Sequence, residues 1–93
     1  MASTFLFGHF DVGDYDTWKK MFDSDPAGRN QSAKGHQVYR SVDSPSDVFV
    51  GLEFGSVEEA RTFRERLLSS GALDNVTVKI EPTIVEVADE ARY

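Results

Sequence analysis

Residues 36–54 read HQVYRSVDSPSDVFVGLEF, and this stretch decides the fold that we expect for the chain. Its two ends, residues 36–41 and 48–54, are rich in the β-branched and aromatic residues that favour strands. The segment between them, residues 42–47 (VDSPSD), has the Asp, Ser and Pro residues that are typical of turns. The stretch therefore predicts a β-hairpin.

An earlier strand is predicted over residues 4–10 (TFLFGHF), which are rich in aromatic residues and are followed by turn residues. Side chains alternate between the two faces of a strand, so Phe5, Phe7 and His9 should share one face. The other face also carries apolar side chains. We therefore expect this strand to be covered on both sides.

A helix is predicted between that strand and the hairpin. Asp14 can cap it by accepting hydrogen bonds from backbone N–H groups two or three residues later. Pro26 should end it, because proline lacks the backbone donor and disfavours helix in the preceding residue. Residues 27–33 are expected to form a second helical piece that stops at Gly35. The side chains that recur at helical spacing in the first piece are Tyr15, Trp18, Met21 and Phe22.

Another helix and a final strand are predicted after the hairpin. Ser56 and Glu59 form the S-x-x-E capping box that opens the helix, and Gly71 is placed to end it. Residues 76–87 (VTVKIEPTIVEV) predict one last strand or a pair of strands. Pro82 interrupts this run, and a proline inside a strand marks an edge or a bulge.

The predicted order is therefore β-α-β-β-α-β, the ferredoxin-like α+β layout of a four-stranded antiparallel sheet with both helices on one face. We expect residues 1–93 to form one domain, with a core over about residues 4–87 and a tail over residues 88–93. The helices would cover one face only, while both faces carry apolar residues. A second copy of the chain packing on the other face would solve this, so a homodimer is expected.

Charge and composition argue against some classes of binding partner. The chain of 93 residues has 10 Lys and Arg against 16 Asp and Glu, a net charge of −6, which argues against nucleic acid or a membrane as a partner. Its densest basic stretch, Arg61, Arg64 and Arg66, alternates with glutamates and is typical of a solvated helix face. There is no cysteine, no long apolar run and no signal-peptide pattern, so a cytoplasmic location is expected.

Several of these segments resemble the dimeric α/β-barrel superfamily, in particular its small antibiotic-biosynthesis-monooxygenase-like and polyketide-cyclase-like proteins. The resemblance extends over about residues 4–87. It rests on His9 followed by Tyr15-x-x-Trp18, on residues 35–40 (GHQVYR), on the D-x-P of residues 43–45, and on residues 52–54 (LEF) before the capped helix.

The resemblance implies a homodimer whose subunits each enclose a ligand cavity, between sheet and helices or near the barrel. It also implies several activities: monooxygenation without a cofactor, polyketide cyclisation, haem degradation and isomerisation. Plant cyclase members use a histidine in the last strand, and residues 76–87 contain none. Haem-degrading members hold their haem with a histidine on a helix, whereas both histidines here are expected on strands.

The histidines His9 and His36 are the candidate catalytic residues, because the pKa of a histidine lies near working pH and allows proton transfer. Either residue could instead make only a structural hydrogen bond. The candidate substrate-binding residues are Phe7, Tyr15, Trp18, Tyr39 and Glu53. Core packing is the alternative role for the aromatic residues, and a solvated rim is the alternative position for Glu53. Asn30, Gln31 and Arg40 are further polar contributors to consider.

No cofactor is expected, and no metal site, since no recognised metal-ligand spacing is present. The preferred function is a cofactor-independent monooxygenase or cyclase for an aromatic or polyketide-like molecule. In that hypothesis His9 transfers the proton, and Tyr15, Trp18 and His36 position the substrate. A ligand-binding or stress-associated dimer without catalysis is the main alternative. A regulatory dimer with a filled core is the third.

Overall fold

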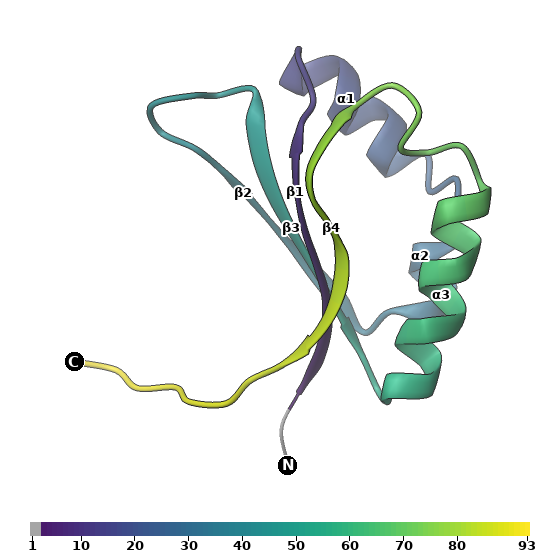
Figure 1. Cartoon of the computed structure of the whole chain (residues 1–93), viewed down its shortest axis with the longest axis vertical. Helices are drawn as coiled ribbons and strands as arrows, with labels where there is room; N and C mark the ends of the chain where they lie inside the picture. Colours follow the sequence, from purple (N-terminus) through teal and green to yellow (C-terminus); the bar gives the residue numbers. More distant parts are fainter. Residues whose placement is uncertain (1–2) are drawn as a thin grey trace.

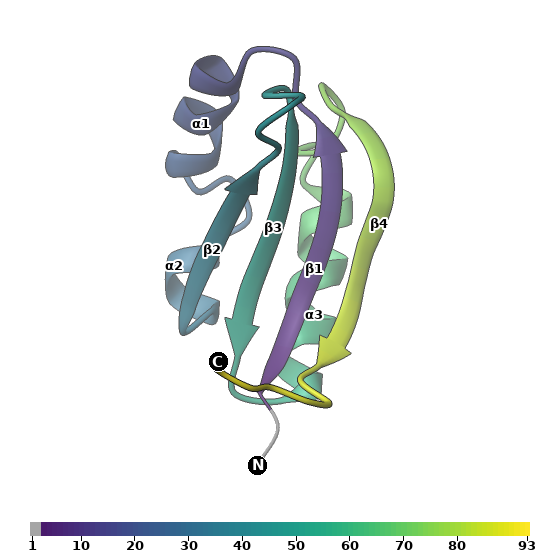
Figure 2. The ribbon, with the colours of Figure 1, turned by 90° about the vertical axis from the view of Figure 1, so that its left-hand side faces the viewer.

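A four-stranded antiparallel sheet with the strand order β2-β3-β1-β4 is the centre of the computed structural model, which describes residues 3–93 (Figure 2). Figure 1 shows that all helices lie on the same side of this sheet. The predicted fold class is confirmed. The elements follow the order β1 (Thr4–Asp11), α1 (Tyr15–Asp23), α2 (Arg29–Ser32), β2 (Gly35–Arg40), β3 (Asp47–Phe54), α3 (Val57–Ser69) and β4 (Thr77–Glu86).

Some strands are longer than predicted, because hydrogen-bonded pairing with a neighbouring strand continues beyond the predicted ends. Asp11 pairs with Asp47, so both residues belong to strands although the sequence placed them in loops. Residues 77–86 form one strand and not a pair. The register of β4 on β1 shifts from Phe7↔Thr83 to His9↔Ile80, which places Pro82 at an irregularity of an edge strand. An edge strand tolerates a residue without an N–H group.

The predicted start and end of the first helix are confirmed. The Asp14 carboxylate accepts a hydrogen bond from the backbone N–H of Thr17 at 3.0 Å, and α1 ends at Asp23, before Pro26. The second helical piece is shorter than predicted, because Gly28, with φ +74°, precedes it in a left-handed conformation.

The Ser56 half of the capping box forms at α3, whereas Glu59 reaches back to the backbone of Gly55 and not to that of Ser56. Ser56 Oγ accepts a hydrogen bond from the backbone N–H of Glu59 at 3.2 Å, and the Glu59 carboxylate accepts one from the backbone N–H of Gly55 at 3.1 Å. Gly71 follows the helix with φ +80°, as the predicted helix end requires. Within the described residues, no helix is long and apolar enough to cross a membrane.

The hydrophobic core lies between the sheet and the helices. Phe54 of β3 and Phe63 of α3 meet there with ring centroids 5.4 Å apart, and both are almost fully buried. Burying side chains of this size stabilises a fold by about 1.5–3 kcal/mol each. The buried apolar residues are Leu6, Phe10, Val12, Trp18, Val48, Val50, Leu52, Phe54, Ala60 and Phe63.

The opposite face of the sheet, which we call the open face, has no helix over it in the described part of the chain (Figure 1). β1 was expected to be covered on both sides, and within one chain only its helix side is covered. Residues 88–93 run beyond β4 toward the side of the open face. The open face includes Phe5, Phe7, His9, Tyr39, Phe49, Ile80 and Val85.

Candidate functional site

A small apolar cavity of about 70 Å³ lies between the sheet and the helices. Two loops, residues 25–27 and 72–73, contribute to its walls. A buried cavity of about 150 Å³ is enough to hold benzene. An aromatic ligand therefore requires these loops or the surrounding side chains to move. The elements contribute Phe10, Val50 and Leu52 from the sheet, Trp18, Met21 and Phe22 from α1, Arg29 from α2, and Phe63 and Leu67 from α3.

Aromatic rings of α1 form one wall of the cavity. The centroids of Trp18 and Phe22 are 5.0 Å apart, and both rings line the space. Residues four apart lie on the same side of a helix, so α1 presents the two rings together. Trp18 also belongs to the hydrophobic core, so its position fits both roles considered for it, a cavity wall and core packing. Tyr15 lies outside the lining, and its ring is covered by the guanidinium of Arg40, with Cζ 4.7 Å from the centroid.

Arg29 is the one residue of α2 that lines the cavity, and its side chain is 7 % exposed. Its guanidinium lies over the ring of Phe22, with Cζ 3.9 Å from the centroid. One terminal nitrogen donates a hydrogen bond to the backbone carbonyl of Phe22 at 2.9 Å. The buried Nε–H has no acceptor among the described residues.

His36 lies at the border of this region. It pairs with Leu52 in the β2–β3 ladder, and its ring meets the edge of Phe22 with centroids 5.2 Å apart. His36 is exposed, yet partial desolvation of its ring lowers its pKa from the ordinary value, and the positive charges of Arg29 and Lys19 lower it further. The imidazole is therefore mainly neutral near pH 7 and can accept a proton.

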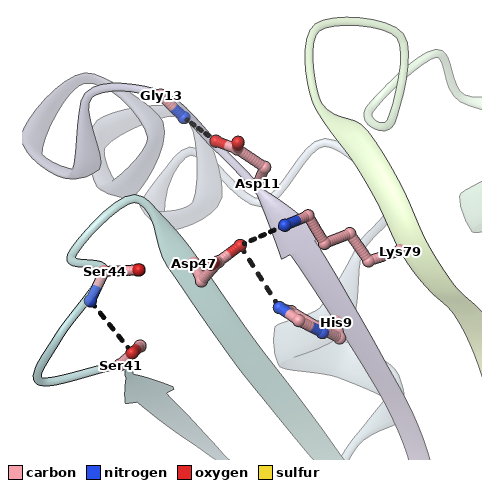
Figure 3. A network of polar contacts seen from close by, with 7 residues as sticks. All are labelled: His9, Asp11, Gly13, Ser41, Ser44, Asp47 and Lys79. Atoms are coloured by element: carbon pink, nitrogen blue, oxygen red, sulfur yellow. Dashed lines mark hydrogen bonds and ion pairs between the residues drawn. The ribbon is translucent and has the colours of Figure 1, made fainter.

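A polar cluster occupies the open face. The Nε2 atom of His9 lies 3.3 Å from Oδ1 of Asp47, and Nζ of Lys79 reaches the same oxygen at 3.3 Å (Figure 3). The His9 ring stacks on Phe49 with centroids 4.1 Å apart. Burial raises the pKa of Asp47, but the hydrogen bonds and charges of Lys79 and then His9 lower it more, so the net pKa lies below its ordinary value.

The sheet separates the predicted site residues into two groups. His9 pairs with Phe49 and lies on the open face, whereas His36 and Trp18 lie on the helix side. The hypothesis that Tyr15, Trp18 and His36 position a substrate against His9 is therefore corrected. The physical reason is the two-residue period of β1, which turns His9 away from its buried neighbours.

The other predicted binding residues also lie on the open face. Phe7 is 6.5 Å from Phe49 between ring centroids. The Tyr39 hydroxyl donates a hydrogen bond to Gln37 at 2.6 Å, and Tyr39 is 52 % exposed. Glu53 is half-buried, opposite Phe5 in the ladder. Phe7 and Tyr39 both adjoin Phe49, the ring on which His9 stacks, and none of these predicted residues lines the cavity.

Asp47, Lys79 and Arg29 are residues of these sites that were missed in the sequence. Asp47 directly precedes the predicted strand, and one more step of alternation would have placed it on the face of Phe49. Arg29 stands in a polar stretch beside Asn30 and Gln31, both of which are exposed on α2. No periodic pattern distinguishes Arg29 from these neighbours, so its burial is visible only in the structure.

Comparisons with known proteins identify the fold. No protein-family model matches the sequence, and no curated protein matches it either. Among solved structures, the chain is similar to a protein of Bordetella bronchiseptica that is provisionally named an antibiotic biosynthesis monooxygenase. The TM-score is 0.59 at 11 % sequence identity, over 98 % of this chain and 100 % of that one. The two proteins share a fold. The ferredoxin-like fold expected from the sequence is thereby confirmed.

Proposed function

We propose that this protein binds an aromatic small molecule in the cavity between sheet and helices and oxygenates or cyclises it without a cofactor, as a homodimer. The observation that carries the proposal is the cavity itself, an apolar space walled by Trp18 and Phe22 and also lined by the buried Arg29. Ligand sites are typically apolar clefts with a few placed polar groups. The shared fold with a protein named a monooxygenase supports the choice of reaction class.

The chemistry assigned to the site is proton removal from an electron-rich phenol. A phenolate can reduce molecular oxygen by itself: one oxygen atom becomes the second carbonyl oxygen of a quinone, and the other leaves as water with the two hydrogens that the phenol loses. The protein then supplies a base and an apolar pocket. His36 is the proposed base because its lowered pKa keeps it neutral. Phe22 contacts both His36 and the cavity, so displacement of its ring by a ligand would join the two.

The homodimer is proposed because the open face carries more apolar surface than a lone sheet would leave in water. Tyr39, Ile80 and Val85 are 52 %, 46 % and 39 % exposed on this face. A second copy placed by two-fold symmetry would cover them together with Phe7 and Phe49. His9 and Asp47 would then lie inside the subunit interface.

A second candidate function is ligand binding without catalysis. One observation favours it: His9, the histidine with a carboxylate partner, lies across the sheet from the cavity. The described residues that line the cavity include no histidine. In this case the cavity would store or sense an aromatic molecule.

Trp18 gives a direct test, because it is the single tryptophan of the chain and lines the cavity. Binding of 1-naphthol, anthrone and related phenols is followed by the emission of Trp18, and turnover by an oxygen electrode. We expect binding together with oxygen uptake. His36→Gln should lower turnover about a hundredfold.

His9→Gln is the matched control and should keep turnover within about twofold, because His9 lies outside the cavity. Loss of turnover in His9→Gln alone would restore the sequence-based assignment of the base. Binding without turnover would favour the non-catalytic function. Trp18 emission unchanged by every aromatic compound would contradict both functions.

A further inference from the structure

We propose that Arg29 is the anion-binding residue of the cavity and that the ligand is an aromatic molecule with a single carboxylate. This inference rests on the proposed function, since it requires that the cavity take an aromatic ligand. It adds the chemical class of that ligand and the residue that recognises it.

The first argument is the state of the Arg29 side chain. An arginine stays positively charged at all relevant pH values, and a buried charge is costly unless an opposite charge or a hydrogen bond compensates it. Arg29 is more than nine-tenths buried, and it takes part in none of the ion pairs of the described residues. The Phe22 ring lies against the guanidinium, and the Phe22 carbonyl accepts one of its hydrogen bonds. The Nε–H group has no acceptor in the described part of the chain.

The second argument excludes the nearest carboxylate as the missing partner. Asp25 also lines the cavity, but one of its oxygens accepts a hydrogen bond from the backbone N–H of Arg29 at 2.6 Å. The other oxygen accepts one from the backbone N–H of Asn30 at 3.1 Å. Asp25 therefore stabilises the start of α2 and leaves the guanidinium of Arg29 without a carboxylate partner among the described residues.

The third argument selects a monoanionic carboxylate. A guanidinium presents N–H groups in a planar fork that matches a carboxylate, and a carboxylate is already ionised at pH 7. A phosphate dianion would meet stronger repulsion from Asp25 in a space of about 70 Å³. The rest of the lining is apolar and aromatic, which suits a ring attached to the carboxylate.

The test compares benzoate with benzamide, which have nearly the same size and differ in charge. Affinities are measured at pH 7 by the emission of Trp18 and by calorimetry. We expect benzoate to bind at least about tenfold more tightly, as a charge-assisted hydrogen bond allows. Arg29→Met should abolish this preference. Arg61→Met, which removes an exposed arginine of α3, should retain it.

The outcomes separate this inference from the proposed function. If benzamide and benzoate bind equally well to the wild type, the role of Arg29 is overturned while an aromatic cavity stands. If neither compound nor naphthalene binds, both proposals fall.

The pKa of His36 in the wild type gives a second test, which does not require Arg29→Met to fold. Benzoate should neutralise Arg29 and so raise the pKa of His36, which the charge of Arg29 lowers. Benzamide should leave that pKa unchanged. An unchanged pKa with bound benzoate would overturn the inference.

Discussion

His9 and Asp47 lie 38 residues apart in the sequence, yet His9 Nε2 and Asp47 Oδ1 are 3.3 Å apart across the β1–β3 ladder. Both side chains are 18 % exposed, and Lys79 of β4 approaches the same carboxylate oxygen. Side chains of three strands thus meet in one polar cluster on the open face. Asp47 also lies opposite Asp11, so Lys79 and His9 offset the repulsion between these two carboxylates.

Asp47→Asn should lower the stability of the fold at pH 7, because it removes the charge that pairs with Lys79 and His9. The folded-state pKa of Asp47 lies below 3.8, so the ionised carboxylate contributes stability above that pH. This contribution is lost as the pH falls through the lowered pKa. The difference in urea midpoint between wild type and Asp47→Asn should therefore shrink in that acidic range.

The matched control for this prediction is Asp43→Asn, which changes an exposed carboxylate in the turn of the same hairpin. Its urea midpoint should follow that of the wild type at each pH, at the same protein concentration. Equal midpoints for Asp47→Asn and Asp43→Asn at pH 7 would show that the polar cluster contributes nothing to stability.

Phe49→Glu should convert the proposed homodimer to a monomer, because it places a charge in the centre of the open face. The wild type should have a solution mass of twice 10.4 kDa, measured by light scattering during size-exclusion chromatography. Leu68→Glu, at a 51 % exposed position of α3, is the control and should leave the dimer intact. A wild-type mass of one chain would remove the dimer from the proposed function.

Gly8→Ala should destabilise the fold by about 1–3 kcal/mol, the usual cost of overpacking a core. A Cβ at Gly8 would lie 2.6 Å from Cζ of the buried Phe10 ring and 3.3 Å from the Ile80 carbonyl. Gly35→Ala is the matched control, since a Cβ there meets no atom within 4 Å. Thermal unfolding of both variants checks the prediction, and equal melting temperatures would contradict it.

The histidine resonances should show His36 titrating below its ordinary pKa of 6.5. Arg29→Met should raise the pKa part of the way only, because desolvation is the larger cause. Lys20→Met is the control, because Lys20 of α1 is not among the charges that shift the pKa of His36. The depressed pKa favours the folded protein above 6.5, and this stability is lost as the pH falls through the lowered value. A pKa at or above 6.5 would remove His36 as the proposed base.

Local signals predicted most of the fold. The caps of Asp14 and Ser56 depend on hydrogen bonds within a few residues, and Gly71 depends on the left-handed conformation that glycine allows; the structure shows all three. Strand alternation likewise placed His9 with Phe5 and Phe7 on one face. The pairing of Asp47 was beyond such signals, because it depends on how far β1 and β3 continue alongside each other.

The alternation of side chains along strands and the helical period predicted which side chains share a face, because both follow from backbone geometry over a few residues. They could not tell whether a charge is compensated, since that depends on what distant elements bring to it. The isolation of Arg29 beneath Phe22 and the separation of His9 from Trp18 by the thickness of the sheet arise only when α1, α2 and the strands pack. The candidate site is therefore the cavity that Arg29 lines, and not the open face that carries His9.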